Sequence, residues 1–133
     1  MQTFTDLSEA LVKKDKVQVL DLSNQGLNRV PIEIGQLTNL TYLHLGGNQI
    51  GELPPEIFRL INLTYLHLGG NQIEEIPSGI SQLVNLTYLH LHTKVVTPEI
   101  GQLINLKHLY LDTEVVPSGI GQLINLCLLY TSP

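Results

Sequence analysis

Histidine is the side chain of this sequence best suited to bind a metal ion, and two histidines, His90 and His92, lie one residue apart. In an extended strand, side chains two positions apart point to the same face. Asp112 occupies the place of His92 twenty residues later, and with His67 and His108 nearby the group offers the three or four ligands that zinc requires. The candidate metal ligands are therefore His90, His92 and Asp112. Because their spacing matches no known zinc motif, we expect no resident cofactor; adventitious binding of zinc is the alternative.

Tyrosine and histidine also recur at fixed intervals, at the third and fifth positions of successive strand-like segments. Neighbouring parallel strands lie ~4.8 Å apart, so these residues would form two rows on one sheet face. Tyrosine supplies a large contact area with a polar tip, which suits recognition of a protein or peptide. The candidate partner-binding residues are Tyr42, His44, Tyr65, His67, Tyr88, His90, His108 and Tyr110; Val19, Asp21, Leu128 and Tyr130 extend the rows. The alternative is that the rows only stabilise the sheet and were copied with each repeat.

The elements that must position these residues are internal repeats. The phrase NLTYLHLGGNQI occurs unchanged at 39–50 and 62–73 and begins again at Asn85. The copies cover residues 17–39, 40–62, 63–85, 86–105 and 106–125, with a partial copy at 126–133. Leucines at positions 1, 4 and 6 alternate with outward residues as a strand requires. Further apolar positions return inward and cover the neighbouring copy, so the repeats predict a solenoid.

The consensus LxxLxLxxNxIxxIPxxIxxLxN resembles the leucine-rich repeat family over almost the entire chain after residue 16. The phrase PxxIxxLxNLxxL is similar to Scribble and Ras-suppressor repeats and to bacterial all-repeat proteins found in pathogens. This resemblance implies an α/β fold: a right-handed solenoid with a curved parallel β-sheet on the concave face and short helical or 3₁₀ turns on the convex face. It also implies a non-enzymatic protein-interaction module, with host interaction as the role in bacterial relatives.

Two features distinguish individual copies. Asn48 and Asn71 stand where an inward amide can bond the turn after the strand; the first copy has Gln25 there, and the shortened copies have no equivalent. The fourth and fifth copies have both lost three residues at the same place, which would make Lys94 and Glu114 stacked neighbours of opposite charge. An exposed pair of this kind is worth only about 0–1 kcal/mol.

The two ends are expected to differ from the middle. Residues 1–16 are predicted to form an N-terminal cap, with a helix from Asp6 to Lys14 and a capping box of Asp6 and Glu9; residues 17–133 form the solenoid. The last copy lacks a return segment, so its strand edge is expected to pair with another chain. The residues of this edge are Leu126, Leu128, Leu129 and Tyr130. The alternative function is a zinc-binding protein or a structural self-assembly protein, such as a homodimer, that uses the histidines or this edge.

Composition excludes several classes of function. A net charge of −5 with seven Lys and Arg argues against nucleic acid or an anionic membrane as partner. No signal peptide or apolar span of ~20 residues is present, and the compartment is not determined. The one cysteine, Cys127, excludes an intramolecular disulfide and has no acid or base arranged around it, so no enzyme is expected. The Asn-Leu-Thr sequons that begin at Asn39, Asn62 and Asn85 are interpreted as repeat residues without glycans.

Overall fold

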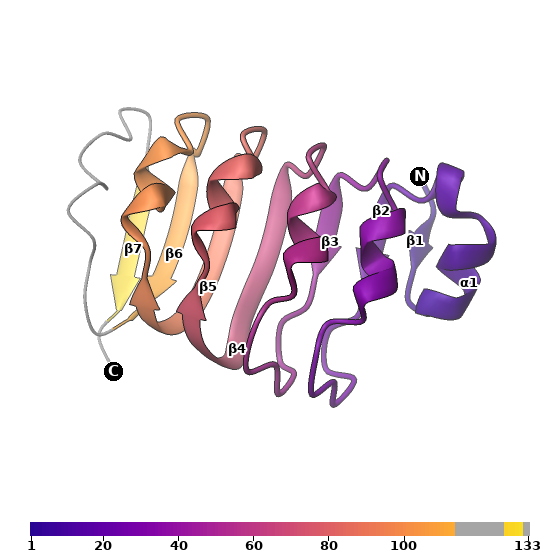
Figure 1. Cartoon of the computed structure of the whole chain (residues 1–133), viewed down its shortest axis with the longest axis horizontal. Coiled ribbons are helices and arrows are strands. Elements are labelled where there is room, and N and C mark those ends of the chain that lie inside the picture. The colour runs from indigo at the N-terminus through magenta and orange to yellow at the C-terminus, as the bar shows by residue number, and fades with distance from the viewer. Residues whose placement is uncertain (114–126, 132–133) are drawn as a thin grey trace.

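The computed structural model describes residues 1–113 and 127–131 and contains a seven-stranded parallel sheet (Figure 1). The strands lie in the sheet in chain order, and each pairs only with its neighbours in sequence. They are β1 (Thr3–Phe4), β2 (Val19–Asp21), β3 (Tyr42–His44), β4 (Tyr65–Ile76), β5 (Tyr88–Val96), β6 (His108–Asp112) and β7 (Cys127–Thr131). The predicted solenoid with one strand per repeat is therefore confirmed.

Short 3₁₀ helices form the return path between strands, as predicted. They are η1 (Lys14–Lys16), η2 (Ile32–Gln36), η3 (Pro55–Arg59), η4 (Ser78–Gln82) and η5 (Pro98–Gln102). Proline stands at or just before the start of each from η2 to η5, where its fixed φ suits a first turn and its missing N–H has no intrahelical partner. Glycine within η2, η4 and η5 opposes longer helix formation. The described helices include none long and apolar enough to span a bilayer.

The sheet is open and uncurled. A solenoid curves when its convex elements are wider than the ~4.8 Å strand spacing, as α-helices of ~10 Å diameter are. Here the return path holds single 3₁₀ turns, which are narrower. In addition, β4 and β5 pair a second time further along the two strands, from Ile73 with Thr93 to Ile76 with Val96. This second pairing keeps the two repeats at strand spacing beyond the segments that carry the tyrosines and histidines.

The first residues form more structure than the sequence predicted. Helix α1 (Leu7–Val12) begins at its N-cap Asp6, whose Oδ1 accepts from the backbone N–H groups of Ser8 (2.7 Å) and Glu9 (3.3 Å). The helix is shorter than the predicted span from Asp6 to Lys14, because a 3₁₀ turn replaces its last residues. Strand β1 pairs with β2 and was not predicted, since two residues carry no detectable alternation. The capping role of residues 1–16 stays a prediction.

The core consists of one stack of mainly aliphatic side chains to which every described repeat contributes. Leu43, Leu66, Leu89 and Leu109 follow one another at the same strand position and are fully buried. The return path adds a second row, Ile34, Ile57, Ile80 and Ile100, also fully buried. Because each row continues through neighbouring repeats, every repeat covers the core of the next one.

Two buried asparagines bond the turns that follow the strands, as predicted. Asn48 is 5% exposed; its Oδ1 accepts from Gln25 N (2.9 Å) and Leu27 N (3.0 Å), and its Nδ2 donates to Leu22 O (3.0 Å) and Leu45 O (2.9 Å). Asn71 makes the same kind of contacts one repeat later. The amide thus links two repeats at each step.

The shortened repeats have no amide at these turns, but the structure shows a buried hydroxyl there instead, which was not predicted. Thr93 and Thr113 are buried at the corresponding turns, with 3% and 1% exposure. Thr93 Oγ1 donates to Val95 O (3.2 Å), and Thr113 Oγ1 donates to Lys94 O (3.0 Å). A hydroxyl is small enough for the tighter turn that remains after three residues are lost, and it still bonds the backbone there.

The change in repeat length produces a step between β4 and β5. The two strands pair up to Leu68 and Leu91, and pairing resumes at Ile73 with Thr93. Between these points β4 has residues 69–72 and β5 has only His92, so β4 carries three extra residues as a bulge. The turn of repeat 3 therefore extends beyond that of repeat 4.

Two expectations for the C-terminal part can be compared with the structure only in part. The repeat alignment placed Leu128 beside His108, but the backbone register pairs Cys127 with His108, so the alignment was wrong by one residue. Leucine occurs on both alternating series of this strand, so its pattern does not fix a register. Glu114 and Leu126 lie outside the described residues, and pairing through this edge stays a prediction.

Candidate recognition surface

Three tyrosines form a stack on the solvent side of the sheet. Tyr42, Tyr65 and Tyr88 pair in register, with ring centroids 4.1 and 4.2 Å apart and interplanar angles of 6° and 9°. The stack ends at β6: His108 lies 6.4 Å from the Tyr88 ring, and Tyr110 lies 5.3 Å from it at 44°. The predicted row is therefore confirmed over three strands and changes geometry at the fourth.

Three histidines form a second stack beside the first. The rings of His44 and His67 are 4.2 Å apart and inclined by 14°, while those of His67 and His90 are 4.2 Å apart and inclined by 43°. His90 then meets Tyr110 at 5.5 Å. We call the surface formed by both stacks the ladder face: Tyr42, Tyr65, Tyr88, His44, His67 and His90.

Backbone amides fix the orientation of two imidazoles. Gly46 N donates to His44 Nδ1 (3.0 Å), and Gly69 N donates to His67 Nδ1 (3.1 Å). A neutral imidazole has one acceptor and one donor nitrogen, so the proton of these rings is on Nε2. Both rings thus keep an N–H donor that the backbone bond does not use.

The stacked arrangement favours neutral side chains. Burial lowers the pKa of His67 to about 4, and the charges that His90 and His44 would carry add to this effect. Burial also lowers the pKa of His90, with His44 contributing. Burial raises the pKa of both Tyr65 and Tyr88. Around neutral pH the side chains of Tyr65, His67, Tyr88 and His90 are therefore uncharged, and they offer O–H and N–H groups.

A carboxylate, Asp21, lies on β2 next to the histidine stack, in register with His44. Burial acts to raise its pKa, but hydrogen bonds from Ser23 Oγ (2.6 Å) and Ser23 N (3.0 Å), with smaller contributions from His44 and His67, leave the pKa below its ordinary value. The ladder face therefore has an anionic border at its N-terminal end.

The glycines two residues after His44 and His67, Gly46 and Gly69, are needed because the imidazole rings lie against them. A Cβ at Gly46 would stand 2.7 Å from His44 Cε1 and 2.8 Å from His67 Cε1. We expect Gly46→Ala to displace both rings, expose them, and raise the pKa of His67 toward its ordinary value of 6.5, because burial and the neighbouring imidazoles cause the depression. An NMR titration of the imidazole resonances measures this. Gly51→Ala is the matched control, since a Cβ there meets nothing within 4 Å; an unchanged His67 pKa in Gly46→Ala would contradict the packing argument.

The predicted metal ligands are only partly brought together. His92 Nε2 lies 3.9 Å from Asp112 Oδ2 as a partly exposed pair, and Asp112 Oδ1 is buried without a hydrogen-bond partner in the part of the chain that the structure describes. Within residues 1–113 and 127–131, no three His, Cys, Asp or Glu side chains are grouped so that they could hold a metal ion. His90 instead packs against His67 and Tyr110.

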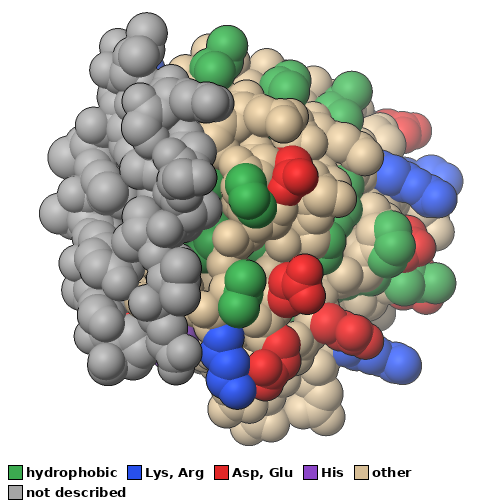
Figure 2. Space-filling model, turned by 60° about the vertical axis from the view of Figure 1, so that its left-hand side comes forward, with side chains coloured by type: hydrophobic (Ala, Val, Ile, Leu, Met, Phe, Trp, Pro, Cys, Tyr) green, Lys and Arg blue, Asp and Glu red, His purple; other side chains and the backbone are tan. Residues whose placement is uncertain are grey.

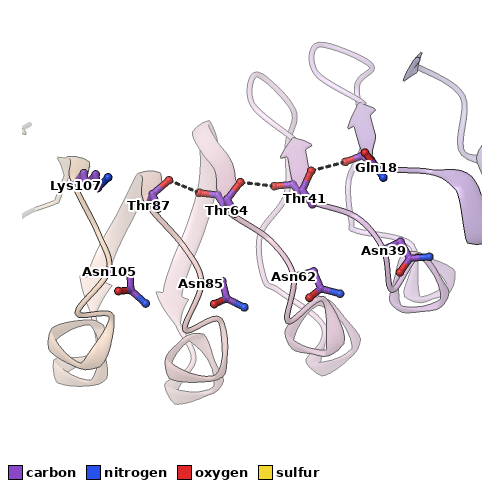
Figure 3. A pocket seen from close by; sticks show the side chains of 9 residues that line it. All are labelled: Gln18, Asn39, Thr41, Asn62, Thr64, Asn85, Thr87, Asn105 and Lys107. Atoms are coloured by element: carbon purple, nitrogen blue, oxygen red, sulfur yellow. Dashed lines mark hydrogen bonds between the residues drawn. The ribbon is translucent and has the colours of Figure 1, made fainter. Parts of the chain in front are cut away.

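Sequence reasoning missed a polar groove at the N-terminal ends of the strands (Figure 3). It has a volume of ≈ 640 Å³ and is lined by Gln18, Asn39, Thr41, Asn62, Thr64, Asn85, Thr87, Asn105 and Lys107. Thr64 Oγ1 donates to Thr41 O (3.2 Å) and Thr87 Oγ1 to Thr64 O (3.1 Å), while Asn62 Nδ2 donates to Thr38 O (2.9 Å). The recurring Asn-Leu-Thr phrase was the available signal, and it indicates bonding between repeats.

Comparisons with known proteins agree with this architecture. The model of the leucine-rich repeat region family matches residues 4–129. A leucine-rich repeat protein of Leptospira interrogans is 40% identical with a TM-score of 0.89, over 99% of this chain and 36% of that one. Internalin C2 of Listeria monocytogenes is 25% identical with a TM-score of 0.80, over 96% of this chain and 57% of that one. The plant peptide hormone receptor RGFR1, solved in complex with RGF2, is 26% identical with a TM-score of 0.64, over 98% of this chain and 27% of that one.

The comparison with curated proteins found no match. The chain spans less than two thirds of the length of the two bacterial proteins, at 36% and 57%. The family match nevertheless extends from β1 into β7. Within this chain a strand and a 3₁₀ helix recur from repeat to repeat, and the buried asparagine of the turn recurs in two repeats. The chain therefore belongs to the leucine-rich repeat family.

Proposed function

We propose that this chain is a non-enzymatic interaction module that binds a protein or peptide partner on its ladder face. The observation that carries the proposal is the in-register stacking of the tyrosines and histidines on the solvent side of the sheet. The leucine-rich repeat fold is commonly a protein-interaction module. The structure of RGFR1 in complex with RGF2 supports the proposal by similarity.

The stacking decides which part of each ring meets a partner. Rings 4.1–4.2 Å apart cover one another's faces, so their edges and polar tips are directed outward. Tyrosine hydroxyls donate and accept hydrogen bonds, and the Nε2–H groups of His44 and His67 donate. The complementary surface is an extended chain with carbonyl or carboxylate acceptors. Because stacking already restricts these side chains, binding costs less conformational entropy.

The bacterial neighbours support a narrower version of this proposal. Two of the similar structures come from Leptospira interrogans and Listeria monocytogenes. We infer on this ground that the chain is bacterial and that its partner is a protein of a host organism. Identifying the protein that the ladder face captures tests this inference.

Removing two tyrosines of the stack is expected to weaken partner binding. Tyr65→Ala and Tyr88→Ala should each cost more than about 1 kcal/mol of binding free energy if these side chains are anchors, with little change in thermal stability. Quantitative pull-downs with wild type and the double variant, followed by titration of the captured partner, measure this effect.

The matched control is Ile61→Ala/Val84→Ala, which truncates two exposed side chains beside the 3₁₀ helices, 54% and 50% exposed. We expect this control to bind like wild type. A partner that ignores the tyrosine changes but loses affinity with the control would place recognition on the opposite side of the molecule.

A further inference from the structure

A hollow next to the step between the long and short repeats has a different character from the ladder face. It has a volume of ≈ 350 Å³ and is lined by Asn71, Gln72, Ile73, Glu74, His92, Thr93 and Lys94. It lies where the bulge of β4 extends past the shorter β5, so the lost residues of repeat 4 open the space. Volumes from about 300 Å³ upward are typical of ligand pockets.

The floor and the rim of this hollow differ chemically. Ile73 and Thr93, 2% and 3% exposed, lie at the floor. Glu74 and Lys94 stand on the rim and form an ion pair of 3.2 Å, with 69% and 64% of their side chains exposed. Exposed pairs of this kind are weak, so an incoming charge can replace one member. The hollow therefore combines an apolar floor with a rim pair that is easily exchanged.

The surroundings of the hollow are acidic. A second hollow shares Glu74 and is also lined by Glu52 and Glu75, so three carboxylates and the ammonium group of Lys94 line the two hollows. Figure 2 shows acidic side chains gathered on the lower part of this face, with basic side chains on either side of them. The net charge of the whole chain, −5, has the same sign. Charge complementarity thus favours a cationic occupant.

We propose that this hollow receives an apolar side chain of a peptide segment that carries lysine or arginine beside it. The apolar side chain covers Ile73, and its cationic neighbours bind Glu52, Glu74 and Glu75 in place of Lys94. The inference rests on the proposed function, because it assigns the occupant to the same class of partner. The hollow is continuous with the ladder face through His92, two residues after His90 on β5.

Three amidated pentapeptides test the proposal by NMR titration of the ¹⁵N-labelled chain. The first has leucine between two lysines, the second has alanine in place of the leucine, and the third has glutamates in place of the lysines. We expect the first to shift the amides of Ile73, Thr93 and Lys94. The alanine peptide should bind about tenfold more weakly, and the glutamate peptide about fivefold more weakly.

Variants of the chain separate local from overall charge. Glu52→Gln/Glu75→Gln should weaken the lysine-leucine peptide about threefold. Glu33→Gln/Glu56→Gln removes the same charge from η2 and η3 and should leave its affinity unchanged. Equal effects of the two pairs, shifts elsewhere, or no shifts up to ~10 mM peptide would overturn the proposal.

The outcome is independent of the test of the ladder face. Absent shifts at Ile73 and Thr93, together with partner capture that depends on Tyr65 and Tyr88, would reject the hollow and keep the proposed function. Shifts at the hollow with partner capture indifferent to both tyrosines would reject the ladder face and keep the hollow.

Discussion

Asn48→Ala is expected to lower the free energy of unfolding by about 3 kcal/mol. The side chain is 5% exposed and bonds five backbone groups, two N–H groups in the preceding repeat and three carbonyls on the two sides of the interface. Each buried group left without a partner costs about 1–3 kcal/mol, and alanine can restore none of these bonds. Urea unfolding followed by circular dichroism gives the value.

Asn62→Ala is the control for this prediction because it makes the same chemical change at an exposed position. Its Nδ2 donates one bond to Thr38 O (2.9 Å) at the surface, where water can replace it. We expect a loss below about 1 kcal/mol. If both variants shift the urea midpoint equally, the buried amide does not have the structural role assigned to it.

The second large effect is a loss of stability in acid caused by the histidine stack. His67 has a pKa of about 4 in the folded state, below its ordinary value of 6.5, so the folded chain binds fewer protons than the unfolded chain between these values. Stability therefore falls as pH decreases from about 6.5 to about 4 and changes no further through this group below that. Because the ring is half-exposed and solvent screens its charge, we expect about 1–2 kcal/mol in total.

Unfolding free energies measured at intervals from pH 7.5 to 4, with wild type and His67→Gln, test this effect. The variant should lose the part of the slope that His67 contributes, while His90, whose pKa is also lowered by burial, keeps its own part. Asp21 does not interfere, because its pKa is lowered and its contribution is lost only as pH falls through that lower value. A His67 resonance that titrates at or above 6.5 in the folded chain would refute the stacking argument.

The sequence predicted the solenoid and the ladder face because both depend on periods that sequence displays directly. A strand side chain alternates with period 2, so Tyr65 and His67 had to share a face, and the repeat had to place each beside its copy. What could not be predicted was ring geometry. The tilt of His90 against His67 depends on the change of neighbour at β6, where Tyr110 follows three histidines.

The other features that were not predicted share a physical cause. The pattern within one repeat does not show how that repeat packs against an adjacent repeat of different length. The hollow beside Ile73 exists only because repeats of two lengths meet there. The role of Thr93 was missed because threonine has no fixed place in the consensus and becomes a turn-bonding residue only after the deletion. The register of β7 was missed because its leucines occupy both alternating series.

The hydrogen bonds at the N-terminal ends of the strands bear on how this chain changes length. Thr64 O accepts a hydrogen bond from Thr87 Oγ1, and Thr64 Oγ1 donates the equivalent bond to Thr41 O. The side chains of Asn62 and Asn85 each donate to a carbonyl 24 residues earlier. A whole 23-residue unit between residues 40 and 85 can therefore be added or removed while each donor still meets an equivalent acceptor. The 20-residue repeat keeps the equivalent bond, from Asn105 Nδ2 to Val84 O (2.8 Å), because its three lost residues come from the turn after the strand. Growth by complete units and changes of length within that turn are therefore the two routes that the bonding pattern leaves open.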